Sequence, residues 1–332
     1  MSQTPQTPTN TTTTQGSIDA HAHWSPQPYF QYAESLGGKT SNGVPSPLMY
    51  DLEARIKWMD SRNVKMHVLS LSGGMPWQWA PLDAADKLAR IVNDAAVEAH
   101  QNFPDRFIAA TAIPMRDPKA ALREMDRMAG KPGICAMHLP NSVEGIDYLF
   151  TPAYEPIVAQ CEALGLPLLF HPLDGEANHY AGTERLAGPN FIYNTLGFPF
   201  ETATLAVKFI YSGYLDKYPK LDIVLPHSGG CFPYIAGRLE HSIKKGAVEA
   251  ASNLKSSMRD YIRRFHYDTL AYYPETLRFM IELVGADRVV IGTDNYAKMD
   301  VEYPNALVES LNLPAADLQK ILYGNAARLM RV

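Results

Sequence analysis

The sequence predicts an α/β fold, a single TIM-type (β/α)8 barrel with long βα loops over its C-terminal mouth. Two observations lead to this prediction: about eight strand-like segments alternate with helix-like segments, and the composition does not change along the chain. The chain has 332 residues, which exceeds the usual size of one domain, but barrels of this class commonly reach such a length. No Gly-x-Gly-x-x-Gly motif follows the first strand, which weighs against a dinucleotide-binding fold.

The N-terminal residues form no part of the expected barrel. Residues 1–15 are almost entirely Ser, Gln, Thr, Pro and Asn, so they have little apolar surface to bury, and we expect a disordered polar tail. We expect residues 16–332 to form the barrel domain.

Two periodicities define the elements in the first half of the chain. Short apolar or β-branched runs predict strands, whereas apolar residues at helical spacing, such as Leu88, Ile91 and Val92, predict helices. Pro152 and Gly165 are the residue types that begin and end a helix. The predicted strands are 16–20, 64–71, 107–113 and 133–139, and the predicted helices are 51–62, 82–102, 118–129 and 152–164.

The second half continues the alternation and ends in two closing helices. Its predicted strands are 166–170, 221–225, 265–270 and 288–291, and its further helices are 200–211, 233–245, 256–264 and 274–284. Two long segments interrupt the pattern, residues 24–50 and 172–196, and both carry Gly and aromatic residues. Because long loops in compact domains are commonly functional, we expect these two loops to set specificity.

Composition excludes several classes of function. The net charge is −5, so the chain lacks the basic excess that holds a nucleic-acid backbone. No apolar run approaches the roughly 20 residues of a membrane span, and residues 1–15 lack the pattern of a signal peptide. The three cysteines are far apart in the sequence, and we expect reduced thiols in a cytoplasmic protein.

Histidine and aspartate side chains stand at the ends of four predicted strands, and such ends share one mouth in a barrel. The residues are His21 and His23 after the first strand, His171, His227 and Asp294. A divalent metal accounts for this set, since three imidazoles and one carboxylate satisfy zinc and leave a position for water. The fifth group is then available for proton transfer near pH 7.

Each of these residues also has a structural explanation when it is taken alone. His171 is explained by a bond to backbone, His227 by a cap on the Gly229-Gly230 turn, and Asp294 by an N-cap or turn. We expect structural roles for His67, His100, His241 and His266, and we leave His138 open. His179, in the second long loop, is a candidate for substrate contact.

Five segments together resemble one superfamily of enzymes. They are Ile18 to His23 (IDAHAH), Asp51 to Asp60 (DLEARIKWMD), Phe170-His171-Pro172, Tyr218 to Arg238 (YPKLDIVLPHSGGCFPYIAGR) and Val289 to Asp294 (VVIGTD). The chain resembles the amidohydrolase superfamily, and within it the branch of 2-amino-3-carboxymuconate-6-semialdehyde decarboxylase and the resorcylate-type aromatic acid decarboxylases. The resemblance spans nearly the whole chain from Ile18 onward.

The resemblance implies an enzyme of aromatic compound catabolism with one divalent metal ion, zinc first and manganese as the alternative. It implies the ligands His21, His23, His171 and Asp294. His227 corresponds to the acid/base histidine of the family. Arg55 and Arg238 correspond to arginines that bind a substrate carboxylate, the second one across the interface of a homodimer. Without the resemblance, each arginine is an ordinary surface ion-pair residue.

The chain departs from its relatives after the metal aspartate, where Asn295-Tyr296 replaces the usual aromatic-proline pair. No lysine near His171 matches the carbamylated lysine of binuclear hydrolases, which favours one metal. The tryptophans Trp24, Trp77 and Trp79 are candidates for stacking on a planar substrate, although core packing is their commoner role.

The favoured hypothesis is a non-oxidative decarboxylase of a small carboxylated aromatic or muconate-semialdehyde-like acid. The alternative is a hydrolase of the same superfamily, in which the metal activates water against a lactone, ester or amide, with His227 or Asp294 as base. A third hypothesis, from another class, is a ligand-binding barrel without an active metal. A product assay separates the first two hypotheses, and a metal assay separates both from the third.

Overall fold

The computed structural model describes residues 15–38, 46–71, 75, 79–143, 145–173, 186, 192–247, 249 and 254–332. Within these described ranges, eight strands form one sheet in chain order, and every neighbouring pair is parallel. The strands are β1 (Ser17–Trp24), β2 (Val64–Leu71), β3 (Phe107–Ala112), β4 (Ile134–Pro140), β5 (Leu168–His171), β6 (Ile223–Leu225), β7 (Phe265–Asp268) and β8 (Val289–Val290). Bridges from Asp19 to Ile291 and from Ala22 to Asn295 join the last strand to the first. The predicted (β/α)8 barrel is therefore confirmed.

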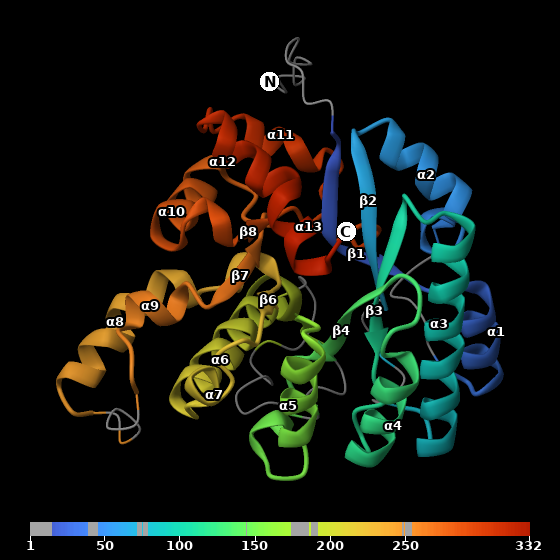
Figure 1. Cartoon of the computed structure of the whole chain (residues 1–332), viewed down its shortest axis with the longest axis horizontal. Coiled ribbons are helices and arrows are strands. Elements are labelled where there is room, and N and C mark those ends of the chain that lie inside the picture. Colours follow the sequence, from blue (N-terminus) through green and yellow to red (C-terminus); the bar gives the residue numbers. More distant parts are fainter. Residues whose placement is uncertain are drawn as a thin grey trace.

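Helices cover the outside of the barrel (Figure 1), and α8 and α9 extend away from the strands. The helices are α1 (Gln27–Ser35), α2 (Leu52–Asp60), α3 (Leu82–Asn102), α4 (Pro118–Met128), α5 (Glu155–Leu164), α6 (Phe198–Tyr211), α7 (Tyr214–Lys217), α8 (Phe232–Lys244), α9 (Met258–Ile262), α10 (Pro274–Val284), α11 (Pro304–Glu309), α12 (Ala315–Gln319) and α13 (Asn325–Met330).

Local sequence explains several features of the helices. In α3, residues four apart such as Leu88, Val92 and Ala96 are buried, which gives the helix one continuous apolar face. The Asp51 side chain accepts a hydrogen bond from the backbone at the start of α2. Gly165 adopts the left-handed conformation that ends α5.

One prediction about the first long loop is wrong. Residues Gln27–Ser35 are helical, because the proline after Gln27 fits a first helical turn and Tyr29, Phe30 and Ala33 share one buried face. The two predicted closing helices are present: α11 is the first, and α12 and α13 form the second, joined without a break by a π-helical segment at Lys320–Gly324. Most of the second predicted loop, residues 172–196, lies outside the described residues. Residues 1–14 of the predicted tail also lie outside them.

The apolar core has two layers. The larger layer lies between the strands and the surrounding helices, and the smaller one fills the barrel interior with residues such as Ile18, Val68 and Ile108. Leu329 and Met330 of α13 pack against this interior layer. The C-terminal helix therefore closes the bottom of the barrel, which leaves the opposite, C-terminal mouth for a functional site.

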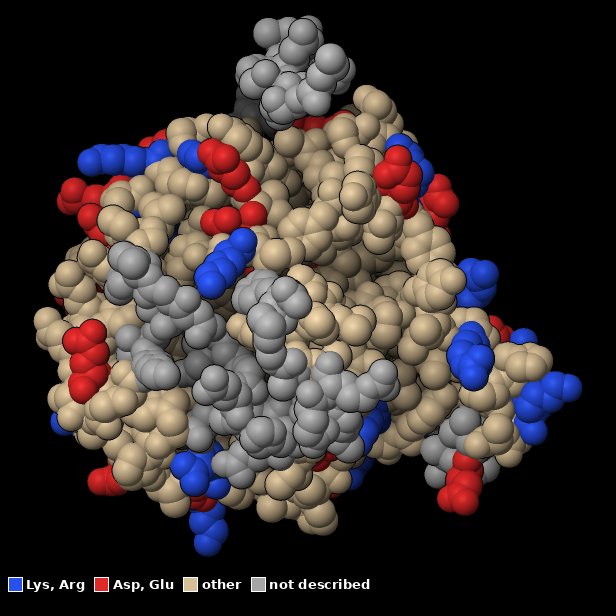
Figure 2. Space-filling model, turned by 180° about the vertical axis from the view of Figure 1, so that it is seen from behind, with Lys and Arg blue, Asp and Glu red and all other residues tan. Residues whose placement is uncertain are grey.

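Charged residues of both signs are spread over one face of the molecule (Figure 2). On the face in Figure 2, the Lys and Arg side chains of described residues are interspersed with Asp and Glu, and most of the surface between them is uncharged. Within the described ranges, no helix has the length and apolar character needed to cross a bilayer.

Candidate metal centre

An extra residue in β1 turns two histidines into the barrel. Asp19 pairs with His67 and Ala22 with Leu69, so Ala20 and His21 of β1 stand opposite a single residue of β2. This β-bulge lets the neighbours Ala20 and His21 both line the barrel interior, where regular alternation would turn one of them outward. His23, two residues further on, then shares the face of His21, as the sequence predicts. β1 therefore runs through both histidines instead of ending at Ala20.

Asp19 supports the bulge. Its Oδ1 accepts hydrogen bonds from the backbone N–H groups of His21 and Thr293, both at 3.1 Å, and Thr293 Oγ1 donates to Oδ2 at 2.5 Å. Burial raises the pKa of Asp19 to about 7, against the lowering effect of these hydrogen bonds. The carboxyl group thus ties β1 to the segment that carries Asp294.

Three imidazole nitrogens and one carboxylate oxygen converge at the mouth of the barrel. His23 Nε2 lies 3.3 Å from His21 Nε2, 3.2 Å from His171 Nε2 and 3.0 Å from Asp294 Oδ1. The same Asp294 oxygen lies 3.6 Å from His21 Nε2. All four side chains are buried. Ligand atoms about 2.1 Å from a tetrahedral metal are about 3.4 Å apart, so these separations fit a coordination shell.

Two hydrogen bonds determine which ring nitrogens of His171 and His21 are unprotonated and direct a lone pair at this centre. His171 Nδ1 lies 2.7 Å from the Pro172 carbonyl and His21 Nδ1 lies 2.8 Å from Asp268 Oδ2, so both Nδ1 atoms carry the proton. A single proton on His23 Nε2 can satisfy only one of its three neighbours. A cation between the four atoms satisfies all of them, so the donor set fits a divalent metal.

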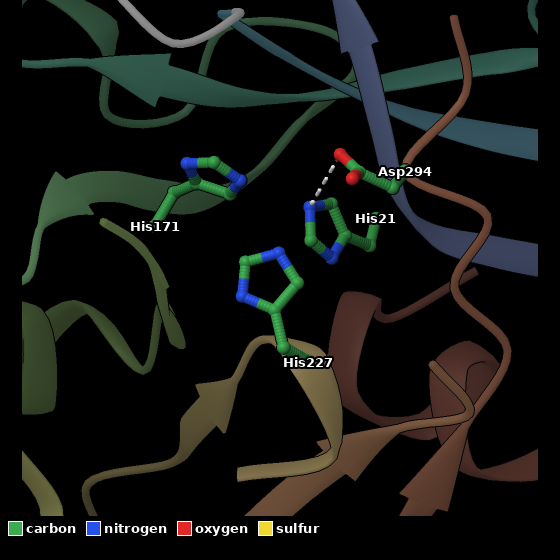
Figure 3. Close-up of side chains that lie close together, drawn as sticks. All are labelled: His21, His171, His227 and Asp294. Atoms are coloured by element: carbon green, nitrogen blue, oxygen red, sulfur yellow. Dashed lines mark ion pairs between the residues drawn. The ribbon is translucent and has the colours of Figure 1, made fainter. Parts of the chain in front are cut away.

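A fourth histidine lies beside this cluster. His227 follows β6, and its ring centroid is 5.2 Å from that of His171 and 5.4 Å from that of His21. Figure 3 shows His21, His171, His227 and Asp294 pointing toward one another, and one ligand atom of each lies within 4.8 Å of the others. Phe198 stacks on the His227 ring. Burial lowers the pKa of His227 to about 4, so the ring is neutral near pH 7.

The turn after β6 requires glycine. His227, Ser228, Gly229 and Gly230 all have positive φ angles, and a Cβ on Gly230 would overlap the Pro199 carbonyl. We expect Gly230→Ala to lower the free energy of unfolding by about 3 kcal/mol, from the left-handed strain and the overlap together.

Gly246 provides the matched control, since it also has positive φ but has open space around its Cα. Gly246→Ala should cost only about 1 kcal/mol, the left-handed strain alone. Equal losses in urea unfolding of the two variants would contradict this account of the turn.

Comparison with known protein families identifies the family of this chain. A protein-family model described as Amidohydrolase matches residues 18–332. The chain belongs to this amidohydrolase family. The resemblance expected from the sequence motifs is therefore confirmed.

Two curated relatives and one solved structure illustrate what this amidohydrolase is similar to. It is 30% identical to the 2-amino-3-carboxymuconate-6-semialdehyde decarboxylase of Dictyostelium discoideum, over 85% of this chain and 77% of the relative. It is 29% identical to a gamma-resorcylate decarboxylase of Rhizobium sp. (strain MTP-10005), over 96% and 99%. A dihydroxybenzoic acid decarboxylase of Polaromonas sp. JS666, solved with bound manganese and the inhibitor 2-nitroresorcinol, matches with a TM-score of 0.76, 27% identity and coverage of 96% and 97%.

The two arginines lie in contrasting places in this amidohydrolase. Arg55 is fully buried, and its guanidinium meets His67 Nδ1 at 3.1 Å and donates to the carbonyl groups of His23 (2.6 Å) and Leu48. It thus holds the backbone of β1 behind the cluster. Arg238 is exposed on α8. Their assignment to a substrate carboxylate stays a prediction.

Of the other expected substrate contacts, the structure describes two tryptophans, and both pack in or against the core. Trp24 ends β1 and is buried in the outer core layer, and Trp79 is half-buried and packs against the same layer. His179 and Trp77 lie outside the described residues. Substrate roles for these residues therefore stay predictions.

Two further polar residues lie at the site: Asp268, which sequence reasoning missed, and His138, whose role it left open. Asp268 ends β7, and His138 of β4 lies with its ring 6.4 Å from His171. With Ser70 they line a cavity of about 20 Å³ beneath the cluster, which is large enough for one water molecule. A carboxylate inside the predicted strand 265–270 was the signal that could have identified Asp268.

A buried carboxyl group above β4 makes stability depend on pH. Glu201 of α6 is 6% exposed and accepts a hydrogen bond from Ser142 Oγ at 2.8 Å. Burial raises its pKa from 4.5 to about 7, so the folded state favours the neutral acid. The stability that this group contributes is present below pH 4.5 and is lost as the pH rises through about 7.

We therefore expect the Glu201→Gln variant to lack this decrease in stability with rising pH. Relative to the variant, the parent protein should lose as much as about 3 kcal/mol of unfolding free energy between pH 4.5 and pH 8. Urea unfolding at the two pH values measures the difference. Parallel pH profiles for the two proteins would contradict the assignment.

Proposed function

We propose that this amidohydrolase is a non-oxidative decarboxylase that uses one divalent metal ion and acts on a small carboxylated aromatic or muconate-semialdehyde-like acid. The observation that carries the proposal is the convergence of three imidazole nitrogens and one carboxylate oxygen, with a fourth imidazole beside them. The curated relatives are named decarboxylases of such acids, which supports the reaction class.

The proposed ligands are His21, His23, His171 and Asp294. Although burial alone would raise it, the pKa of Asp294 is held at about 2 by His23 and His21, so the carboxylate is ionised. Nitrogen-rich tetrahedral ligation suits zinc, and the manganese in one structural relative makes manganese the alternative. The strand that carries His171, β5, contains no lysine, which supports a single ion.

The bound ion supplies Lewis-acid polarisation of a substrate oxygen. His227 serves as the proton carrier. Breaking the bond to the carboxylate releases CO2 and leaves its electron pair on the substrate carbon, which must then take up a proton. Neutral imidazole has one N–H and one lone pair, so His227 can pass a proton from solvent to that carbon. Phe198, stacked on the ring, restricts its orientation and excludes water from that face.

Carboxylate binding by arginine forms the last part of the proposal. Bidentate guanidinium bonding suits a carboxylate. Three of the five N–H donors of Arg55 already bind His67 Nδ1 and two backbone carbonyls, and its buried Nε–H has no hydrogen-bond partner among the described residues. This Nε–H is the donor that Arg55 would offer to a substrate carboxylate. Arg238, exposed on the projecting helix α8 (Figure 1), would serve the site of a second copy in a homodimer.

A product assay tests the reaction class. Purified metal-loaded protein is incubated with hydroxybenzoates and carboxymuconate semialdehydes, and CO2 release is measured beside hydrolysis of a lactone and ester panel. We expect CO2 and the decarboxylated product from at least one acid. Hydrolysis of the panel without any CO2 would replace the proposal with the hydrolase alternative.

A further inference from the structure

The carboxylate of Asp268 gathers four hydrogen-bond donors at the base of the cluster. Asp268 is fully buried. Its Oδ2 lies 2.8 Å from His21 Nδ1 and accepts the backbone N–H of His227, also at 2.8 Å. Its Oδ1 accepts the backbone N–H groups of Ser228 at 2.7 Å and Leu270 at 3.1 Å. Backbone N–H groups only donate, so both carboxylate oxygens must accept.

These donors come from the two parts of the site that have different tasks. His21 belongs to the proposed metal shell, whereas His227 and Ser228 form the turn of the proton carrier. Both turn residues have φ angles of 54°, a conformation that costs non-glycine residues free energy unless the surroundings hold it. Their two successive N–H groups point at one carboxylate, which supplies that restraint.

We propose that Asp268 is a positioning residue that sets the tautomer of His21 and the place of His227 at once. By accepting a hydrogen bond from His21 Nδ1–H, it keeps the proton on Nδ1 and leaves the Nε2 lone pair directed at the cluster. By accepting the N–H groups of His227 and Ser228, it holds the fourth imidazole beside the same centre. The inference rests on the proposed metal site, and nothing in the sequence motifs assigned Asp268 a role.

The substitution Asp268→Asn distinguishes this positioning role from a role in packing alone. Each carboxylate oxygen accepts two hydrogen bonds, and an amide NH2 in either place meets two donors. With NH2 toward His21, the ring must present its Nδ1 lone pair, so the proton moves to Nε2 and blocks the metal side. With NH2 toward Ser228 and Leu270, the turn loses its restraint instead. Asn has almost the size of Asp, so packing alone does not distinguish the two residues.

A suitable control is Glu201, which is also a buried carboxyl group. Its Oε2 accepts a hydrogen bond from the Ser142 hydroxyl, and neither residue belongs to the cluster. A Gln amide can accept this hydrogen bond with its oxygen, and the hydroxyl can also rotate to accept from the NH2. Glu201→Gln therefore removes a buried carboxyl group without removing a partner of His21 or His227.

The first experiment compares the parent protein, Asp268→Asn and Glu201→Gln in zinc affinity, by competition with a chromogenic chelator, and in the rate of CO2 release. We expect Asp268→Asn to bind Zn²⁺ about 10–100-fold more weakly, the usual effect of losing the partner of a metal-bound histidine. We expect Glu201→Gln to stay within about threefold of the parent in zinc affinity. An Asp268→Asn variant with both the zinc affinity and the CO2 release rate of the parent would overturn the inference but leave the proposed function intact, whereas a parent protein without zinc affinity would overturn both.

A second measurement needs no variant at this position. Proton–nitrogen NMR of the metal-free parent protein, labelled with ¹⁵N-histidine and assigned by His21→Gln, reports the tautomer of His21. We expect the proton on Nδ1. A proton on Nε2 would overturn the inference even if Asp268→Asn does not fold.

Discussion

His227→Ala is expected to lower kcat for decarboxylation by about 10³-fold while the protein keeps its metal. The reason is that a positioned proton carrier contributes about 10²–10⁴-fold, and the four proposed ligands remain in place without it. The measurement is CO2 release in single-turnover kinetics, with metal content determined by elemental analysis of the same sample.

The position of His227 makes this a sharp test. One of its ring nitrogens lies within 4.8 Å of ligand atoms on His21, His171 and Asp294, so a role as a ligand is the rival assignment. If metal content falls together with the rate, His227 is a ligand and the proton carrier lies elsewhere. His241→Ala, which removes an exposed histidine of α8, should leave metal content unchanged.

The second large effect is expected for His23→Ala, which should bind metal more than about 100-fold more weakly. Removing only the partner of a ligand costs about 10–100-fold, and the loss of a ligand should exceed it. His23 Nε2 is the atom with three of the short contacts in the cluster. Chelator competition with Zn²⁺ and with Mn²⁺ measures the change.

His67→Gln is the matched control for His23→Ala. His67 is also a fully buried histidine near β1, but its Nδ1 bonds Arg55 and its ring does not join the cluster. Its replacement should change metal affinity much less than the loss of His23 does. Similar affinities for His23→Ala and the parent protein would show that the ligand set is wrongly assigned.

Much of the fold follows from periodicity along the chain. The predicted bounds of β2, α3 and α10 agree with the structure, because each is a long or strongly patterned segment between clear breakers such as Pro274. The meeting of the strand-end histidines could also be predicted, since the parallel strands of a barrel bring residues that are far apart in the sequence to one mouth. The imidazoles of His23 and His171, which are 148 residues apart, illustrate this.

The features that sequence reasoning missed depend on pairing between segments. The bulge at Ala20 and His21 exists only relative to the register of β2, and a single sequence carries no register. Asp268 gains its importance from donors on β1 and after β6, which no local pattern reveals. α1 was hidden because nine residues with an early proline resemble a loop.

Metal content and CO2 release, measured on one preparation during stepwise return of Zn²⁺ or Mn²⁺ to chelator-treated protein, test the central claim most directly. The account predicts that metal-free protein is inactive and that the rate rises in proportion to metal until about one ion is bound per chain. Full decarboxylation without metal would contradict the account.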